Sequence, residues 1–245
     1  MAALQPLSRR WARLRAWVLQ TSHLVLVIGG LSALAALVGV GALAVNDFRT
    51  VRISHQNHAA MLARVLEDQA TRTMQTAELA LESLATSPAL TAVASEPRRM
   101  QDALGQALAA LSFLRGLAVV DAGGRVIAST LPGDAESFVD LAQLGPPVAV
   151  GRTVQGGLTP GRSLQSVRLG GKAVAAPAGV AFIPVMHGYK TEAGQVLVLV
   201  ALVNPDSLSN FQHLTLESEI FNSVVTAYNG QVLATSGARR PRLES

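Results

Sequence analysis

The clearest candidate for ligand chemistry is Arg162, in a loop that also contains Gly156, Gly157 and Gly161. A guanidinium group presents a rigid fork of hydrogen-bond donors that fits a carboxylate, and nearby glycines let the backbone approach a small ligand closely. Arg162 is therefore the first candidate for ligand binding. A solvated loop arginine without a specific ligand is the alternative.

Three further side chains could complete a pocket around such a ligand. His187 and Tyr189 lie in a predicted turn between two apolar strands, where they could face the loop of Arg162. Phe182, on the preceding strand, could form a wall, because ligand pockets are lined mainly by apolar and aromatic side chains. For each of the three, a structural role is the alternative.

Residue patterns for catalysis or metal binding are absent from the sequence. There is no cysteine and no Gly-x-Ser-x-Gly motif, and the serines and histidines lack the spacing of a catalytic triad. His55 and His58 are close on a predicted helix, but no carboxylate shares their face within a turn. Asp121 precedes a glycine turn, which it is expected to fix. The sequence therefore predicts no enzyme, no metal site and no cofactor.

An uncharged apolar segment, residues 24–45, is long enough to cross a bilayer core of about 30 Å. We predict a transmembrane helix here. A cleaved signal peptide is the alternative, because Ala42 and Ala44 could mimic a cleavage site, but signal peptides have a shorter apolar region. The membrane is therefore an expected partner.

The distribution of charge predicts how the chain is oriented. Four arginines and no acidic residue precede the apolar segment, so residues 1–23 are expected in the cytoplasm. The domain that follows would then lie in the periplasm, anchored to the inner membrane. The formal net charge of +4 comes from dispersed basic residues apart from short groups near the two ends, a pattern that predicts no nucleic-acid partner.

Residues 46–93 contain a predicted long helix. No proline or glycine occurs between residues 46 and 86, and apolar residues from Met61 to Leu84 recur at helical spacing. The apolar stripe is expected to pack on a domain or on a second copy, so a homodimer is predicted. Because the helix continues from the transmembrane segment, it could conduct a signal. A helix that merely packs is the alternative.

Residues 94–213 are predicted to form an α+β module with an antiparallel sheet. The predicted elements are a helix over residues 98–111, a hairpin of strands 117–121 and 125–130, a helix over 134–144, strands over 148–154, 180–186 and 195–203, and a helix over 207–213. Gly123 and Gly124 allow the tight turn of the hairpin. Asn204 is the predicted N-cap of the last helix.

A second hairpin, in residues 223–236, repeats the first at a constant offset. Gly124 corresponds to Gly230 and Val126 to Val232, and the small residues that follow also match. Two hairpins with glycine turns resemble each other in any case, so coincidence is the alternative. A duplication would make residues 214–245 the start of a second module.

The order of these elements resembles the Cache family of PAS-like extracytoplasmic sensor domains. The resemblance covers residues 46–237 and includes Val120-Asp121-Ala122-Gly123-Gly124 and Ile183-Pro184-Val185. It implies a ligand pocket between the sheet and the loops after its second strand, within residues 151–189, and a double-Cache arrangement of two modules. After Arg162 the sequence departs from the amino-acid-binding members, which couple their arginine to nearby aromatic residues.

The resemblance also implies a function. This region would bind a small solute and relay the signal across the membrane to a cytoplasmic transmitter, in the first place a histidine kinase, otherwise a diguanylate cyclase or chemotaxis module. The sequence contains no transmitter motif and no second spanning segment, so a fragment or a truncated receptor is expected. The alternative is a membrane-tethered structural or protein-interaction domain without a small-molecule ligand.

Overall fold

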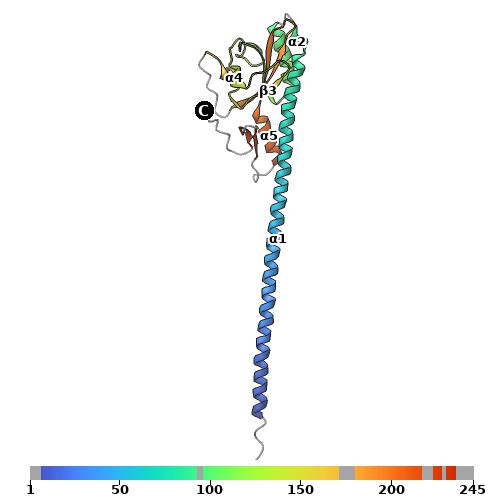
Figure 1. Cartoon of the computed structure of the whole chain (residues 1–245), viewed down its shortest axis with the longest axis vertical. Helices are drawn as coiled ribbons and strands as arrows, with labels where there is room; N and C mark the ends of the chain where they lie inside the picture. The colour runs from blue at the N-terminus through green and yellow to red at the C-terminus, as the bar shows by residue number, and fades with distance from the viewer. Residues whose placement is uncertain (1–6, 93–95, 171–179, 217–222, 228–229, 236–245) are drawn as a thin grey trace, which may run out of the picture. The chain divides into compact units, whose positions relative to one another are not determined.

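The structure, a computed structural model, describes residues 7–92, 96–170, 180–216, 223–227 and 230–235. Its longest element is the helix α1 (Leu7–Ala85), and the chain divides into two compact units, Met1–Ala60 and Met61–Ser245. The second unit holds the sheet and the C-terminal part of α1, which lies beside the sheet (Figure 1). The helix predicted after residue 46 is therefore confirmed as part of α1.

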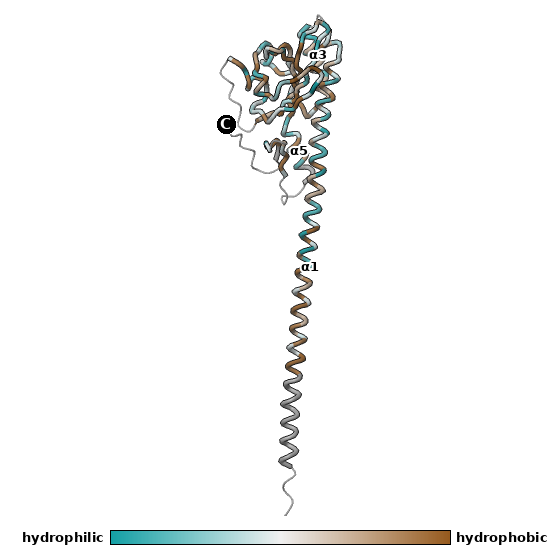
Figure 2. The backbone as a smooth tube through the Cα atoms, in the orientation of Figure 1, coloured by the Kyte–Doolittle hydropathy of each residue, from teal (hydrophilic) through white to brown (hydrophobic). Residues whose placement is uncertain are grey.

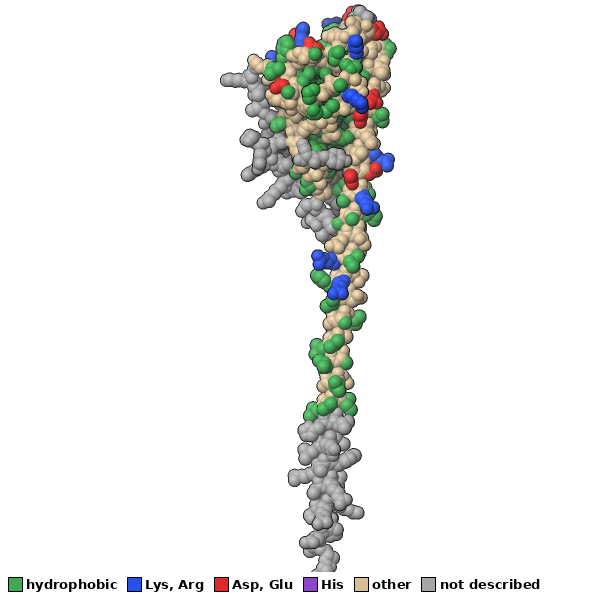
Figure 3. Space-filling view, viewed as in Figure 1, with side chains coloured by type: hydrophobic (Ala, Val, Ile, Leu, Met, Phe, Trp, Pro, Cys, Tyr) green, Lys and Arg blue, Asp and Glu red, His purple; other side chains and the backbone are tan. Residues whose placement is uncertain are grey.

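The apolar stretch of α1 belongs to the first unit. Side chains of residues 25–45 are exposed, and this stretch is brown to white in Figure 2 and carries green side chains without red or blue in Figure 3. Among the described residues, α1 is the one helix long and apolar enough to cross a membrane. An exposed apolar stretch of this length is unfavourable in water, whereas a bilayer would bury it.

Six strands form one antiparallel sheet. Along the sheet the order is β2-β1-β6-β5-β3, and β4 pairs with the start of β5. The strands are β1 (Leu114–Asp121), β2 (Val126–Ser129), β3 (Thr153–Gln155), β4 (Thr159–Pro160), β5 (Ala181–Lys190) and β6 (Val196–Val203). The central strands are almost entirely buried, which explains their near-continuous apolar sequences. The predicted α+β fold is confirmed.

Strand β5 is longer than the sequence predicts. A turn is predicted over residues 187–194, but the strand continues to Lys190. His187 pairs with Leu199 on one side and with Thr153 on the other. The predicted turn is therefore wrong for His187 and Tyr189, which are strand residues with paired neighbours.

Gly188 lets a loop pass close to β5. A Cβ atom there would lie 2.6 Å from the carbonyl oxygen of Ala149, so glycine lets the preceding loop cross close to the strand. That loop occupies most of the strand predicted over residues 148–154, and β3 begins at Thr153. The turn after β5 is short and uses Gly194, whose φ is +85°.

Short helices connect and cover the strands. They are α2 (Pro88–Thr91), α3 (Pro97–Ala110), α4 (Leu141–Leu144), the 3₁₀ helix η1 (Leu164–Val167) and α5 (Pro205–Leu216). The predicted helices at α3 and α5 are confirmed, and Asn204 Oδ1 caps α5 by accepting a hydrogen bond from Asp206 N–H at 3.1 Å. Of the helix predicted over residues 134–144, α4 alone is present, because Glu136 has a φ of +62°, outside the right-handed helical region.

The sheet separates two apolar cores. On the helix face, Leu199 of β6 shares one apolar cluster with Leu81 of α1 and with Leu104 of α3, the helix that lies beside β1 and β2. On the loop face, alternate strand residues such as Phe182 pack against the connecting segments, among them Leu164 of η1. Leu81 is fully buried, and burying a leucine side chain contributes about 1.5–3 kcal/mol. Apolar contacts of this kind hold α1 on the sheet.

A two-stranded sheet follows α5. Its strands are β7 (Val224–Thr226) and β8 (Val232–Thr235). Val224 pairs with Thr235 as Ala118 pairs with Ser129 in the first hairpin, and both hairpins have a register shift at the corresponding place. The sequence match between the hairpins is therefore also a match of strand register. Asn229, predicted in the second turn, lies outside the described residues.

The turns of the two hairpins also correspond. Gly124 and Gly230 have φ values of +84° and +83°, which favour glycine. In the first turn, Asp121 Oδ1 accepts hydrogen bonds from the backbone N–H groups of Gly123 at 2.8 Å and Arg125 at 2.9 Å. The predicted role of Asp121 in fixing the turn is confirmed.

Candidate functional site

Phe182 lies near the start of β5, on the loop face of the sheet. Its side chain is fully buried and belongs to the same cluster as Leu164 of η1, Leu144 of α4 and Val139. Its backbone pairs with Thr159 of β4. Phe182 is thus on the side of the sheet where the sequence analysis expects a pocket, as a packed residue beneath the loops.

Arg162 lies between β4 and η1, at the end of the sheet where β5 begins. Gly161 donates a backbone hydrogen bond to Val180 O at 2.8 Å and has a φ of +122°, so the loop turns sharply here. The Arg162 side chain is exposed. Its guanidinium lies near Arg115, a residue that the sequence analysis did not identify.

Arg115 sits on a β-bulge at the start of β1. The register between β1 and β6 shifts between Leu114 and Gly116, which leaves Arg115 as the bulged residue. Its Nε and Nη2 donate to Asn204 Oδ1 at 2.9 and 2.7 Å, and Nη2 also pairs with Asp206 Oδ2 at 2.8 Å. Arg115 therefore links β1 to the start of α5.

Burial, one negative charge and one positive charge all affect the pKa of Arg115. Burial lowers the pKa of its guanidinium, Asp206 opposes this change, and the positive charge of Arg162 lowers the pKa further. A lone arginine among the apolar residues of a strand is a sequence signal that could have identified it. Sequence alone does not show that Arg162 lies nearby, because β4 and β1 belong to distant segments.

Asp134 is a buried carboxylate in the loop after β2. Its Oδ2 accepts hydrogen bonds from Leu164 N–H at 3.3 Å and Ser129 Oγ at 3.4 Å, whereas Oδ1 has no hydrogen-bond partner among the described residues. Burial raises the pKa of Asp134, and hydrogen bonds, the largest from Leu164, act in the opposite direction. Asp134 thus ties β2 to η1, close to the loop of Arg162.

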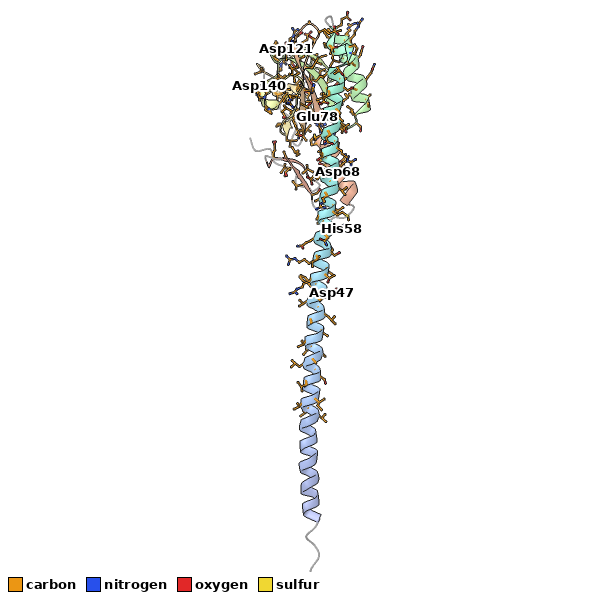
Figure 4. The ribbon with its side chains drawn as sticks, turned by 45° about the vertical axis from the view of Figure 1, so that its right-hand side comes forward. Asp47, His58, Asp68, Glu78, Asp121 and Asp140 are labelled. Carbon is orange, nitrogen blue, oxygen red and sulfur yellow. The ribbon has the colours of Figure 1, made fainter. Side chains whose placement is uncertain are left out.

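His187 lies on the helix face of β5 and is 6% exposed. Its Nδ1 shares a hydrogen bond of 2.8 Å with Thr153 Oγ1. Burial lowers the pKa of His187, while the negative charges of Glu82 and Glu78 on α1 raise it. Figure 4 shows Glu78 on the stretch of α1 that lies beside the sheet. His187 therefore interacts with α1 rather than with the loop of Arg162.

Tyr189 follows on the same face of β5. Its ring belongs to the apolar cluster that includes Leu81 and Leu199. The hydroxyl group is buried and has no hydrogen-bond partner in the described part of the chain. Burial also raises the pKa of the Tyr189 hydroxyl group well above its ordinary value. This side chain is thus a core residue with an unsatisfied polar group.

The four predicted ligand-binding residues divide between the two faces of the sheet. Phe182 lies on the loop face and Arg162 is exposed in the loop before η1, whereas Tyr189 and, by strand alternation, His187 lie on the helix face. The structure does not bring all four into one pocket, and ligand contact by each of them stays a prediction. Over the described residues there is no group of three His, Cys, Asp or Glu side chains that could hold a metal ion.

No family model matches the sequence, and no curated protein matches it. The sensor domain of the Vibrio cholerae histidine kinase DctB is similar, with a TM-score of 0.50 and 13% identity over 74% of this chain and 66% of that domain. The ligand-binding domain of the Pseudomonas fluorescens chemoreceptor CtaA, solved with L-serine, has a TM-score of 0.49 and 15% identity over 75% of this chain and 73% of that domain. The extracellular domain of rpHK1S-Z16, described as a histidine kinase, has a TM-score of 0.43 and 17% identity over 62% of this chain and 58% of that domain.

These neighbours are sensor domains of histidine kinases and chemoreceptors. The chain shares its fold with the DctB sensor domain. The resemblance found in the sequence is thereby confirmed at the level of the fold, which is what a likeness at such identities shows.

Proposed function

We propose that this chain is the sensor region of a bacterial membrane receptor, which binds a small solute outside the cytoplasm and relays the signal inward. The double role of α1 is the main support. This helix contributes Ala77 and Leu81 to the core beneath the Cache-type sheet, and it also contains the apolar segment that could cross a membrane. A ligand that binds two packing states of that core with different affinity would bias the position of α1.

We propose a histidine kinase as the transmitter, with a diguanylate cyclase or a chemoreceptor module as alternatives. DctB, whose sensor domain shares the fold, is a histidine kinase. In this proposal the transmitter lies outside the 245 residues of the chain. The sensor region itself would bind and relay without enzymatic activity.

The proposed orientation has residues 1–23 in the cytoplasm and the sheet in the periplasm. The support is the excess of N-terminal arginines over acidic residues. Because the chain has no cysteine, single introduced cysteines can report the topology. In spheroplasts, a membrane-impermeant maleimide should label Gly123→Cys, at an exposed hairpin turn, and should not label Ser8→Cys. The reverse labelling pattern would contradict this orientation.

The proposed receptor is a homodimer formed through α1. Met61, Val65 and Leu79 are 58%, 45% and 65% exposed. They share one face of the helix, because Val65 lies about one turn after Met61 and Leu79 about four turns after Val65. Cysteines at these three positions should cross-link in membranes, whereas cysteines at the buried Ala77 and Leu81 should not. A monomer at every position would contradict the dimer.

The proposed ligand contact is at the loop side of the sheet, with Arg162 as the polar anchor and Phe182 behind it. Burial of Phe182 beneath the loops and exposure of Arg162 beside them support this assignment. His187 and Tyr189 lie under α1 and would sense a ligand through the packing of the sheet. A direct contact by either residue would require a ligand on the helix face.

The test is a thermal-shift screen of small carboxylates and amines on the purified full chain in detergent. A solute at a concentration 100 times its Kd should stabilise the protein by about 2.7 kcal/mol, and the shift should saturate. If no solute produces a saturable shift and the chain instead retains a specific protein partner, the sensor proposal is wrong. The membrane-tethered interaction domain would then be the better description.

A further inference from the structure

A basic stretch follows the apolar segment of α1. Between residues 48 and 66 the chain has Arg49, Arg52 and Arg64 but no aspartate or glutamate. Arg49 and Arg52 are exposed, and Figure 3 shows blue side chains directly beyond the exposed green ones. Neither arginine belongs to the core of the sheet or to the candidate ligand site.

Arg49 and Arg52 share one side of α1. Residues three apart on an α-helix are separated by about 60° around its axis, so the two guanidinium groups can reach one ligand. Asp47, the nearest carboxylate in sequence, lies about 140–160° around the axis from either arginine. Neither arginine side chain has a hydrogen bond or ion pair with a residue that the structure describes. This side of the helix therefore carries two positive charges that no described carboxylate neutralises.

The position of the two arginines along α1 matches the depth of lipid headgroups. The uncharged segment, residues 24–45, is about 33 Å long, close to the thickness of a bilayer core. In a helix perpendicular to the membrane, Arg49 lies about 6 Å and Arg52 about 10 Å beyond this core, and the headgroup layer is about 5–7 Å thick. Helical side chains lean toward the N-terminus of their helix, so Arg52 reaches back toward this layer. Both guanidinium groups therefore come within reach of lipid phosphates.

Apolar side chains around the arginines support the same placement. Phe48 is 69% exposed and precedes Arg49, and Val51 and Ile53 are 47% and 56% exposed. Such exposure is unfavourable in water, whereas the boundary between acyl chains and headgroups accommodates apolar side chains. The first two turns after the uncharged segment thus combine apolar and cationic side chains, which is the combination that binds a membrane interface.

We propose that Arg49 and Arg52 together bind the phosphate group of an anionic phospholipid, in the leaflet where the apolar segment of α1 ends. The lipid is a further partner of the proposed receptor, and its binding rests on the proposed membrane anchor. A guanidinium group binds a phosphate through paired hydrogen bonds, and a lipid with a net negative charge offsets two positive charges better than a zwitterionic lipid does. Because α1 is one continuous helix, the bound lipid fixes its depth and its rotation in the membrane.

The experiment measures which lipid lies next to this part of α1. Because the chain has no cysteine, Ile53→Cys gives a single attachment site for a fluorophore on the full chain in phosphatidylcholine vesicles. Nitroxide-labelled phosphatidylglycerol and nitroxide-labelled phosphatidylcholine are compared as quenchers at equal mole fraction. Phosphatidylglycerol should quench more strongly, and the excess should fall at least about fivefold when Arg49→Gln and Arg52→Gln are combined.

Two matched variants separate charge at this site from charge elsewhere. Arg49→Lys combined with Arg52→Lys keeps the positive charges but loses the paired donors, so it should retain part of the excess. Arg72→Gln removes an exposed arginine that already pairs with Asp68 at 2.8 Å, and it should leave the excess unchanged. Equal quenching by phosphatidylcholine in all variants verifies that the helix is inserted alike.

Three outcomes would overturn the lipid site. One is equal quenching by the two lipids, and another is an excess that the combined glutamine variant leaves intact. The third is equal quenching by the lipids while labelled chains quench one another, since this side of α1 would then contact a second copy. In all three cases the membrane anchor stands. If neither lipid quenches the fluorophore, the segment does not span and the proposed anchor is wrong as well.

Discussion

Gln231 Oε1 accepts a hydrogen bond of 3.2 Å from the backbone N–H of Leu158, across 73 positions of sequence. Leu158 belongs to the loop that leads into β4, and Gln231 follows the turn of the second hairpin. Leu158 and Leu233 also share the apolar core of the helix face. The loop beside the sheet and the hairpin beyond α5 are therefore in direct contact.

This contact predicts that Gly157→Ala and Gln231→Ala have overlapping effects. A Cβ atom on Gly157 would lie 2.5 Å from Gln231 Oε1, so the glutamine side chain would have to leave Leu158. Loss of that hydrogen bond should cost about 0.5–1.5 kcal/mol in either variant. The double variant should cost little more than one of them, as measured by a double-mutant cycle of chemical denaturation. Additive losses would show that the two residues are not coupled.

Asp134→Asn is expected to change how stability depends on pH. Because burial raises the pKa of Asp134, the folded state holds its proton more tightly than the unfolded state does. The stability from this group is present below the ordinary pKa of about 3.9 and is lost as the pH rises through the raised pKa. The free energy of unfolding of Asp134→Asn, relative to the unmodified chain, should therefore increase with pH. A constant difference would contradict this.

His187→Asn is expected to reduce sensitivity to acid. Burial lowers the pKa of His187 despite the opposing charges of Glu82 and Glu78, so the folded state disfavours the protonated ring. The stability from the neutral ring is present above about pH 6.5 and is lost as the pH falls through the lowered pKa. Melting temperatures measured downward from neutral pH should fall less steeply in the variant. His55→Asn, at an exposed position of α1, is the matched control.

Tyr189→Phe is expected to be neutral or stabilising. The hydroxyl group of Tyr189 is buried without a partner among the described residues, so its removal should recover up to about 1–3 kcal/mol of desolvation cost. Tyr189→Ala should instead destabilise the chain by about 3–5 kcal/mol, because it leaves a cavity in the core. Thermal denaturation compares the two variants. Clear destabilisation by phenylalanine would mean that the hydroxyl group has a stabilising contact.

Leu81→Ala is expected to loosen α1 from the sheet. Leu81 is fully buried on the helix face, so its truncation should cost about 2–5 kcal/mol. Ser83→Ala, at an exposed position on the same turn of α1, should change stability by less than about 0.5 kcal/mol. Chemical denaturation measures both. Equal effects would contradict the packing of α1 on the sheet.

The fold was accessible from the sequence where local patterns determine it. The long run without proline or glycine predicts α1, the cap at Asn204 predicts α5, and glycine turns predict both hairpins. The turn predicted at His187 was wrong because histidine and glycine, here His187 and Gly188, look like turn residues. Both stay in the strand through tertiary contacts: His187 pairs with Thr153, and Ala149 approaches Gly188 closely.

The candidate site was less accessible. Residue type identifies Arg162 as a possible anion ligand, but its neighbour Arg115 depends on a bulge that no local pattern predicts. Aspartate in a loop is ordinarily exposed, so residue type does not predict the burial of Asp134. Its burial follows from the position of η1. Strand β5 is long enough to include both Phe182 and His187. Because residues along a strand alternate between the two faces of the sheet, these two side chains lie on opposite faces. Long-range geometry therefore determines the site.

The strand order has a consequence for how the protein is made. β1 lies between β2, its neighbour along the chain, and β6, which follows only after all the other strands of the sheet. Contacts between such distant segments fold slowly, because a long loop must close before they form. On the ribosome, α1 and the β1–β2 hairpin would emerge first, and the centre of the sheet could close only when β6 appears. If the apolar helix enters a membrane as proposed, its insertion would precede completion of the sheet.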